Sequence, residues 1–187
     1  MVQIGRSEMF PIALDLSKIN ILLIGKGEAL QRRHKQLLEY GATQLTVCHT
    51  AEGRYLCLDN MDASLRWHDN NIIMISGLSY EESKQIAGAA RAAGKLVNAE
   101  DMNDLCDFYF TANVKRGDLV ISVSTGGASP TLSRRIRDYI AEKFGAEWAE
   151  RTKEIAEFRT SLKDKGKTIP QVLEASDIFL KEKGWLK

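Results

Sequence analysis

Two glycines near the start of the chain stand where a backbone turn could hold a phosphate group. The segment from Ile19 to Ala42 reads INILLIGKGEALQRRHKQLLEYGA. A glycine-rich turn between a buried strand and a helix brings backbone N–H groups to a pyrophosphate, and the helix N-terminus adds partial positive charge. The G-x-G-x-x-G pattern requires a small last residue, and this sequence has Leu30 there. The residues that we predict to contact a dinucleotide in this turn are Gly25, Gly27, Glu28 and Ala29.

A second candidate anion site lies in the segment STGGASPTLSRRIRDYI, from Ser124 to Ile140. Pro130 suits the first turn of a helix because its missing N–H is not needed there. Backbone N–H groups at a helix start attract carboxylates and phosphates, and three arginines follow within two turns. An ordinary capped helix with arginines facing water has the same pattern, so both interpretations stay open. The residues that we predict to bind an anionic substrate are Ser124, Thr125, Gly126, Gly127, Ser129 and Arg134.

The first of these candidate sites, the glycine turn, lies in a part of the chain where strands alternate with helices. Ile19 to Ile24 is a continuous apolar run, which is typical of a parallel strand covered on both faces. The pattern predicts a helix ending before Gly41, further strands at 44–47, 72–75 and 95–98, and a helix from Glu81 to Ala93 ended by Gly94. Residues 50–71 fit neither a helix nor a strand pattern well. The fold class is therefore α/β, with a Rossmann-like parallel sheet over residues 1–106.

The pattern changes from Asp107 onward. Two β-rich runs flank Lys115-Arg116-Gly117-Asp118, which predicts a β-hairpin, and helices are expected at Ser129–Phe144 and Trp148–Leu162 before a shorter helical tail. A parallel sheet leaves the edges of such a hairpin uncovered, so we expect a two-fold homodimer through this region. We divide the extension into a dimerisation and substrate-binding segment, 107–147, and a C-terminal helical segment, 148–187.

Composition excludes several classes of protein. Lys and Arg number 26 against 25 Asp and Glu, so the charge gives no reason to expect a nucleic acid or membrane partner. Cys48, Cys57 and Cys106 lack metal or redox spacing, and we interpret them as buried thiols in a reducing cytoplasm. The sequence shows no leader pattern at its start and no apolar run near the roughly 20 residues that a membrane helix needs. The three histidines have no paired ligand spacing, so we expect no metal site.

Three segments together resemble a known family. ILLIGKGEALQRR, LVNAEDMNDLCDF and LVISVSTGGASPTLSRRIRDYI are similar to the precorrin-2 dehydrogenase module of siroheme synthases, including the stand-alone form that is also a ferrochelatase. The resemblance implies NAD-dependent oxidation of the tetrapyrrole precorrin-2 to sirohydrochlorin in siroheme biosynthesis, with iron insertion in bifunctional members. It also implies dimerisation through the segment after the Rossmann domain. The eight carboxylates of such a substrate suit a turn that offers several donors at fixed spacing.

The same resemblance implies roles for single residues. VNAED contains Asn98 as a substrate contact and Asp101 as the catalytic acid or base. Glu100 is the nearest carboxylate that could be mistaken for it. A carboxylate there can take up a proton as hydride leaves, whereas AEDMNDL can also be an acidic helix start in which Asp101 only caps. Thr50 and Ala51, after the second strand, complete the predicted NAD contacts.

Three features depart from the family pattern at the cofactor. They are Lys26, Leu30 and the turn Ser76-Gly77-Leu78-Ser79. Two alternatives to the dehydrogenase therefore stay open: a tetrapyrrole-binding chelatase or carrier that has lost NAD binding, and a non-catalytic dimeric scaffold.

Overall fold

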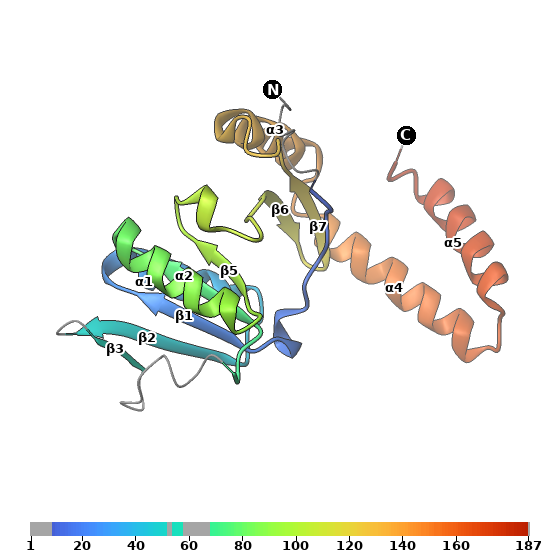
Figure 1. Ribbon diagram of the computed structural model, residues 1–187. Coiled ribbons are helices and arrows are strands. Elements are labelled where there is room, and N and C mark those ends of the chain that lie inside the picture. The colour runs from blue at the N-terminus through green and yellow to red at the C-terminus, as the bar shows by residue number, and fades with distance from the viewer. Residues whose placement is uncertain (1–8, 52–53, 58–67, 187) are drawn as a thin grey trace, which may run out of the picture. The chain divides into compact units, whose positions relative to one another are not determined.

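The computed structural model describes residues 9–51, 54–57 and 68–186 of the chain (Figure 1). These residues form two compact units, one of Phe10–Phe110 and one that contains the chain from Thr111 onward. The predicted division into 1–106, 107–147 and 148–187 stays a prediction.

A five-stranded sheet with the order β3-β2-β1-β4-β5 forms the first unit. Four strands are parallel: β1 (Ile21–Gly25), β2 (Leu45–Ala51), β4 (Ile72–Ser76) and β5 (Leu96–Ala99). The short strand β3 (Arg54–Cys57) pairs antiparallel with β2. The Rossmann-like α/β prediction is confirmed. Strand β3 was not predicted, because it falls in the polar segment that matched no periodic pattern.

The apolar run of β1 is continuous because helices cover both faces of the sheet. Successive strand residues point to opposite faces. Leu22 and Ile24 therefore pack in one cluster with helix α2 (Tyr80–Ala92), whereas Ile21 and Leu23 pack in another with α1 (Gly27–Glu39). All four side chains are fully buried. Two short 3-10 turns, η1 (Leu16–Lys18) and η3 (Asn103–Leu105), precede β1 and follow β5.

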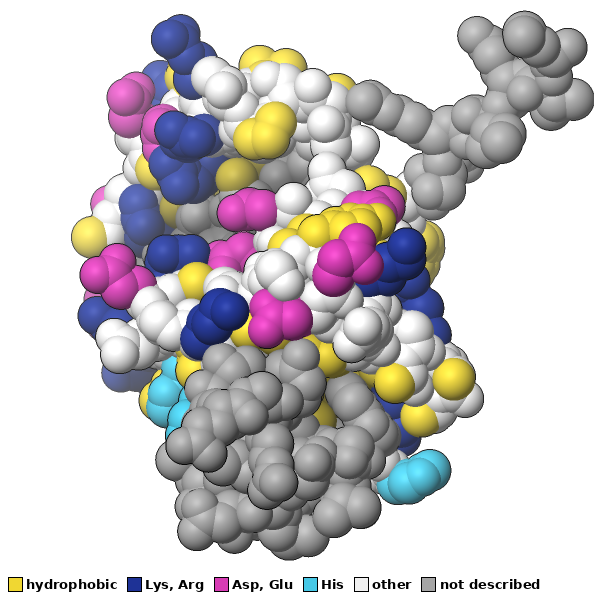
Figure 2. Space-filling model, turned by 60° about the vertical axis from the view of Figure 1, so that its left-hand side comes forward, with side chains coloured by type: hydrophobic (Ala, Val, Ile, Leu, Met, Phe, Trp, Pro, Cys, Tyr) yellow, Lys and Arg dark blue, Asp and Glu magenta, His cyan; other side chains and the backbone are white. Residues whose placement is uncertain are grey.

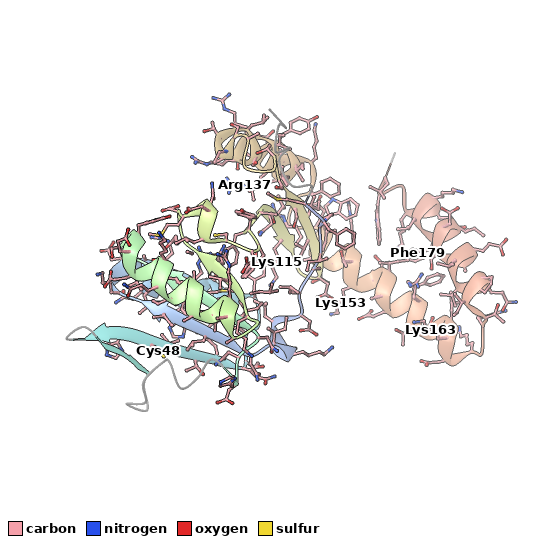
Figure 3. All side chains as sticks on the ribbon, viewed as in Figure 1. Cys48, Lys115, Arg137, Lys153, Lys163 and Phe179 are labelled. Carbon is pink, nitrogen blue, oxygen red and sulfur yellow. The ribbon has the colours of Figure 1, made fainter. Side chains whose placement is uncertain are left out.

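The cysteines differ from one another. Cys48 is fully buried on β2 (Figure 3) and is disulfide-bonded, so its interpretation as a free thiol is wrong. Cys106 is a free, half-buried thiol. The positions of three cysteines in a sequence do not reveal which of them the sheet brings together, because that depends on strand order.

A β-hairpin and a helix begin the second unit. Strands β6 (Ala112–Arg116) and β7 (Leu119–Val123) flank a turn in which Gly117 has a φ of +57°, as the sequence predicted. Helix α3 (Pro130–Lys143) packs on this hairpin. Arg116 Nε donates to Phe144 O at 2.9 Å and so satisfies a carbonyl at the C-terminal end of α3.

Two further helices, α4 (Trp148–Asp164) and α5 (Ile169–Lys183), complete the chain. Phe158 on α4 stacks on Phe179 on α5 at 4.5 Å between ring centroids, and Trp185 meets Phe179 edge-on at 5.7 Å. The expected short tail is thus a full helix of 15 residues. Among the helices in the described ranges, none has both the length and the apolar character required to cross a bilayer.

Candidate functional site

The turn between β1 and α1 is built around two glycines with different tasks. A Cβ on Gly25 would lie 2.0 Å from the carbonyl oxygen of Ser76, so the close approach of β1 and β4 requires glycine there. Gly27 has a φ of +63°, and a Cβ added to it would meet nothing within 4 Å. The backbone at Gly27 is therefore left-handed and faces open space, as a phosphate-binding turn requires.

The first turn of α1 leaves backbone donors free for an anion. Lys26 at the N-cap provides no side-chain cap. Among the described residues, none accepts a hydrogen bond from the N–H groups of Gly27, Glu28 or Ala29. These donors lie at the positive end of a 13-residue helix, which is the usual arrangement for holding a pyrophosphate. The residues present fit the diphosphate of a dinucleotide.

Leu30 does not fill the role of the small residue that ends the fingerprint. Its side chain is 8% exposed and packs in the cluster between α1 and the sheet. The close approach occurs one residue earlier: a Cβ on Gly77 would lie 2.5 Å from Lys26 O and 3.1 Å from Ala29 Cβ. Ala29 and Gly77 thus provide the small-residue contact at the start of α1.

The turn after β4 has its own physical explanation. Ser79 caps α2: its hydroxyl accepts from the Glu82 N–H at 3.4 Å, and its own N–H donates to Glu82 Oε2 at 2.9 Å. The Ser76–Ser79 turn differs from the family pattern. Close packing explains its Gly77, and capping of α2 explains its Ser79. The sequence pattern did not indicate this, because Gly77 contacts a segment about fifty residues earlier.

The parallel strand order brings most of the predicted cofactor residues to the carboxyl edge of the sheet. Gly25 is in register with His49 on β2 and with Ser76 on β4, so Thr50 and Ala51 follow at the same carboxyl edge. The backbones of Thr50 and Ala51 pair with Tyr55 and Arg54 of β3. Their side chains lie outside the described part of the structure, and their contact with a cofactor stays a prediction.

Asp101 has the features of an available carboxylate. It follows β5 by two residues at the carboxyl edge, is exposed, and accepts no hydrogen bond or ion pair from any described residue. Its φ of +61° is the one left-handed value among the non-glycine residues that the structure describes. Aspartate tolerates this region better than most side chains, but its occurrence here indicates a constrained turn.

The side chain of Asn98 points inward, toward the returning chain. It is 6% exposed, and its Nδ2 donates to Phe108 O at 2.9 Å. The Ala99 N–H donates to Cys106 Sγ at 3.3 Å, and burial raises the pKa of this thiol. The Val97 N–H donates to an Asp107 carboxylate oxygen at 2.9 Å. The geometry therefore gives Asn98 a bracing role in the loop of Asp101, and a substrate contact from it stays a prediction.

Glu100 belongs to a charged cluster that connects this loop to α1. Its Oε1 lies 2.8 Å from Arg32 Nη2 and 3.4 Å from Arg33 Nη2. Arg33 is enclosed, with its guanidinium carbon 4.0 Å from the centroid of the Phe110 ring. Burial lowers the pKa of Arg33, and the Glu100 carboxylate opposes that shift. No local spacing in the sequence predicted this cluster, because only the parallel strand order brings α1 to the end of β5.

In the second unit, the predicted anion turn uses its hydroxyl groups for its own structure. The Ser129 N–H donates to Thr125 Oγ1 at 3.1 Å, and Thr125 Oγ1 lies 3.0 Å from Ser133 Oγ. The Leu132 N–H donates to Ser129 Oγ at 3.1 Å, which is an N-cap, and the Gly126 N–H donates to Ser124 Oγ at 3.2 Å. The hydroxyls of Ser124, Thr125 and Ser129 therefore shape the turn, which the sequence pattern did not distinguish from ligand binding.

Backbone groups and an arginine remain available at that turn. Gly126 and Gly127 have φ values of +59° and +78°, and a Cβ on either would meet nothing within 4 Å. Within the described ranges, the N–H groups of Gly127 and Thr131 have no hydrogen-bond acceptor, and exposed Arg134 has no ion-pair partner. An anion at this turn would be bound by backbone N–H groups and Arg134.

The described residues contain no group of three or more potential metal ligands. Figure 2 shows acidic and basic side chains interspersed over one face of the molecule. This mixture accords with the net charge of +1.

Family models match nearly all of the first unit and the first part of the second. Residues 12–112 match the family described as "Putative NAD(P)-binding", and residues 116–143 match the sirohaem biosynthesis protein central family. The second match contains the hairpin turn and all of α3.

Relatives and a solved structure agree with these matches. The siroheme synthase of Methylococcus capsulatus is 34% identical over an alignment of 142 residues, and the alignment covers 71% of this chain and 30% of that protein. The siroheme synthase of Nitrosomonas eutropha is 28% identical over 162 residues, 81% of this chain and 34% of that one. The chain thus spans about a third of the length of these curated relatives. The structure of SirC, precorrin-2 dehydrogenase, superposes with a TM-score of 0.68 at 20% identity, covering 96% of this chain and 93% of that chain, and shows the same fold.

Proposed function

The chain belongs to this NAD(P)-binding family, and from that premise we propose that it is the precorrin-2 dehydrogenase module of siroheme biosynthesis. It oxidises precorrin-2 to sirohydrochlorin with NAD⁺ as the acceptor. The observation that carries the proposal is one edge of a parallel sheet with a glycine turn for a dinucleotide and a carboxylate, Asp101, that forms no ion pair with the residues described.

The first turn of α1 would hold the cofactor. The N–H groups of Gly27, Glu28 and Ala29 would bind the pyrophosphate, and Gly25 keeps the turn close to β4. When bound, NAD⁺ supplies an acceptor for hydride. Lys26, which replaces a glycine, forms an ion pair with Glu82 at 3.5 Å, so its side chain is directed toward α2.

Asp101 takes up the proton in the oxidation. Precorrin-2 loses two hydrogens, one as hydride and one as a proton, and a carboxylate without a hydrogen bond or ion pair to any described residue can accept the latter. Backbone N–H groups at Gly127 and Thr131, with Arg134, bind acidic side chains of the macrocycle. Ferrochelation stays a prediction, as does a cytoplasmic location.

An assay under anaerobic conditions tests the function. Purified protein with precorrin-2 and NAD⁺ is expected to produce NADH and sirohydrochlorin in equal amounts, followed by the absorbance of both products. Omission of NAD⁺ is the control. Binding of precorrin-2 without any NADH production, at millimolar NAD⁺, would reject the dehydrogenase and favour the carrier that has lost its cofactor.

We also propose that the chain forms a homodimer through the hairpin and α3. One face of α3 exposes three apolar side chains at helical spacing: Leu132 at 50%, Ile136 at 37% and Tyr139 at 61%. An exposed apolar stripe on an otherwise charged helix is typical of an interface.

Light scattering is expected to give a dimeric mass for the wild type at tens of micromolar protein. The Leu132→Glu variant is expected to be monomeric, with nearly unchanged thermal stability. The matched control is Leu173→Glu on α5, which changes a leucine that is 56% exposed outside the proposed interface. A monomeric wild type, or a Leu132→Glu variant that stays dimeric, contradicts the interface.

A further inference from the structure

The residue directly before Asp101 is fixed at both its backbone and its side chain. The Glu100 N–H donates to Ile75 O at 2.9 Å, which extends the pairing of β5 with β4 by one residue. Its side chain is 13% exposed, and its carboxylate meets two guanidinium groups of α1. Glu100 is thus held both to the sheet and to a helix.

The two arginines of this cluster differ in their surroundings. Arg32 is closer to Glu100 but 66% exposed, and ion pairs with such exposed groups are weakened by solvent. The side chain of Arg33 is 12% exposed, stacks on Phe110 and donates to Gln36 Oε1 at 2.8 Å. Arg33 is therefore the rigid member of the cluster, and loss of Glu100 would leave its charge largely buried without its partner.

The backbone after Glu100 turns sharply. Asp101 has a φ of +61°, and the Met102 N–H then donates to Ala99 O at 3.2 Å to close the turn. Because Asp101 accepts no hydrogen bond and forms no ion pair with a described residue, the direction of its carboxylate depends on the residues that flank it. Of these flanking residues, Glu100 is the one that forms ion pairs, with Arg32 and Arg33.

We propose that Glu100, anchored by Arg33 on α1, is a positioning residue that fixes the Asp101 turn at the end of β5. The inference rests on the proposed function, since it assigns Asp101 the proton transfer. It adds that one helix serves both parts of the site: the first turn of α1 faces the cofactor, and its second turn holds the loop of the catalytic carboxylate.

Steady-state kinetics of Glu100→Gln test this role. The substitution keeps the size of the side chain and removes its charge. We expect kcat for precorrin-2 oxidation to fall roughly ten- to hundredfold, as for a misplaced catalytic group, with KM for precorrin-2 and the Kd of NAD⁺ each within about twofold of wild type. Hydrogen exchange at the Met102 amide should be faster, while exchange in β1 stays unchanged.

Two further variants separate positioning from general effects. Glu39→Gln makes the same chemical change on α1, in an exposed pair with Lys35 at 4.0 Å, and is expected to keep wild-type kinetics. Arg33→Lys retains the charge but loses the planar stacking on Phe110, so it should lower kcat less than Glu100→Gln. If Glu100→Gln folds poorly, Arg33→Lys tests the positioning role in its place.

The outcomes distinguish this inference from the function on which it rests. A wild-type chain without turnover overturns both. An active wild type with an unchanged kcat in Glu100→Gln overturns the positioning role alone, as does an equal loss of NAD⁺ affinity, which would show that Glu100 acts through the cofactor turn.

Discussion

Replacement of Asp101 by asparagine is expected to lower the rate of precorrin-2 oxidation by about 10²–10⁴-fold, the usual range for loss of a general base. Asparagine has the size of aspartate and also tolerates a left-handed backbone, so the turn at φ +61° is retained. Alanine is a poorer choice because it would add backbone strain to the loss of the carboxylate. The measurement is kcat at saturating NAD⁺, beside tetrapyrrole binding followed by fluorescence quenching, which should stay within about twofold.

Asp104→Asn is the matched control for Asp101→Asn. Asp104 lies three residues further along the same loop and accepts a hydrogen bond from the Tyr80 hydroxyl at 2.6 Å. An amide oxygen can accept the same bond, so turnover should change little. If the Asp101→Asn variant oxidised precorrin-2 at the wild-type rate, Asp101 would have no part in the reaction. The acidic turn would then be structural.

Replacement of Gly27 by valine is expected to abolish NAD⁺ binding. Its side chain would occupy the open space beside the turn, and a β-branched residue is strained at a φ of +63°. Isothermal calorimetry with NAD⁺ and NADP⁺ measures the loss, and thermal unfolding shows whether the variant is folded.

The other end of the same helix provides the control for Gly27→Val. Gly41 has a φ of +81°, and a Cβ there also meets nothing within 4 Å. Gly41→Val should therefore cause similar strain and a similar loss of stability, but leave NAD⁺ affinity unchanged. Equal affinities of wild type and Gly27→Val would exclude the β1–α1 turn as the cofactor site.

Elements with clear periodicity or punctuation could be predicted from the sequence. The continuous apolar runs of β1 and β4 indicated buried parallel strands, and Gly41 and Gly94 marked the ends of α1 and α2. The four-residue strand β3 could not be predicted, because its assignment depends on pairing with β2 and not on its own composition. The disulfide of Cys48 was missed for the same reason: the partner of a cysteine is set by tertiary structure.

The candidate site was predictable where backbone geometry carries the chemistry. The turn at Gly27 could be identified because an open left-handed position at the start of a helix favours glycine, whereas its contact with the cofactor stays a prediction. The hydroxyls of Thr125 and Ser129 accept hydrogen bonds within their own turn, which a sequence does not show, and their contact with a ligand stays a prediction. The pairing of Glu100 with Arg33 could not be predicted, because it joins residues on different elements that only the folded sheet brings together.

The central position of β1 also affects how the unfolded chain can reach this fold. Ile21 pairs with Leu45 on one side and with Ile72 on the other, at roughly twice the separation along the chain. Chain-closure entropy grows only with the logarithm of length, so the longer closure costs only about 0.6 kcal/mol more than the shorter one. Entropy thus gives neither neighbour a decisive advantage, and the buried apolar side chains of β1, on both faces of the sheet, favour both pairings during folding.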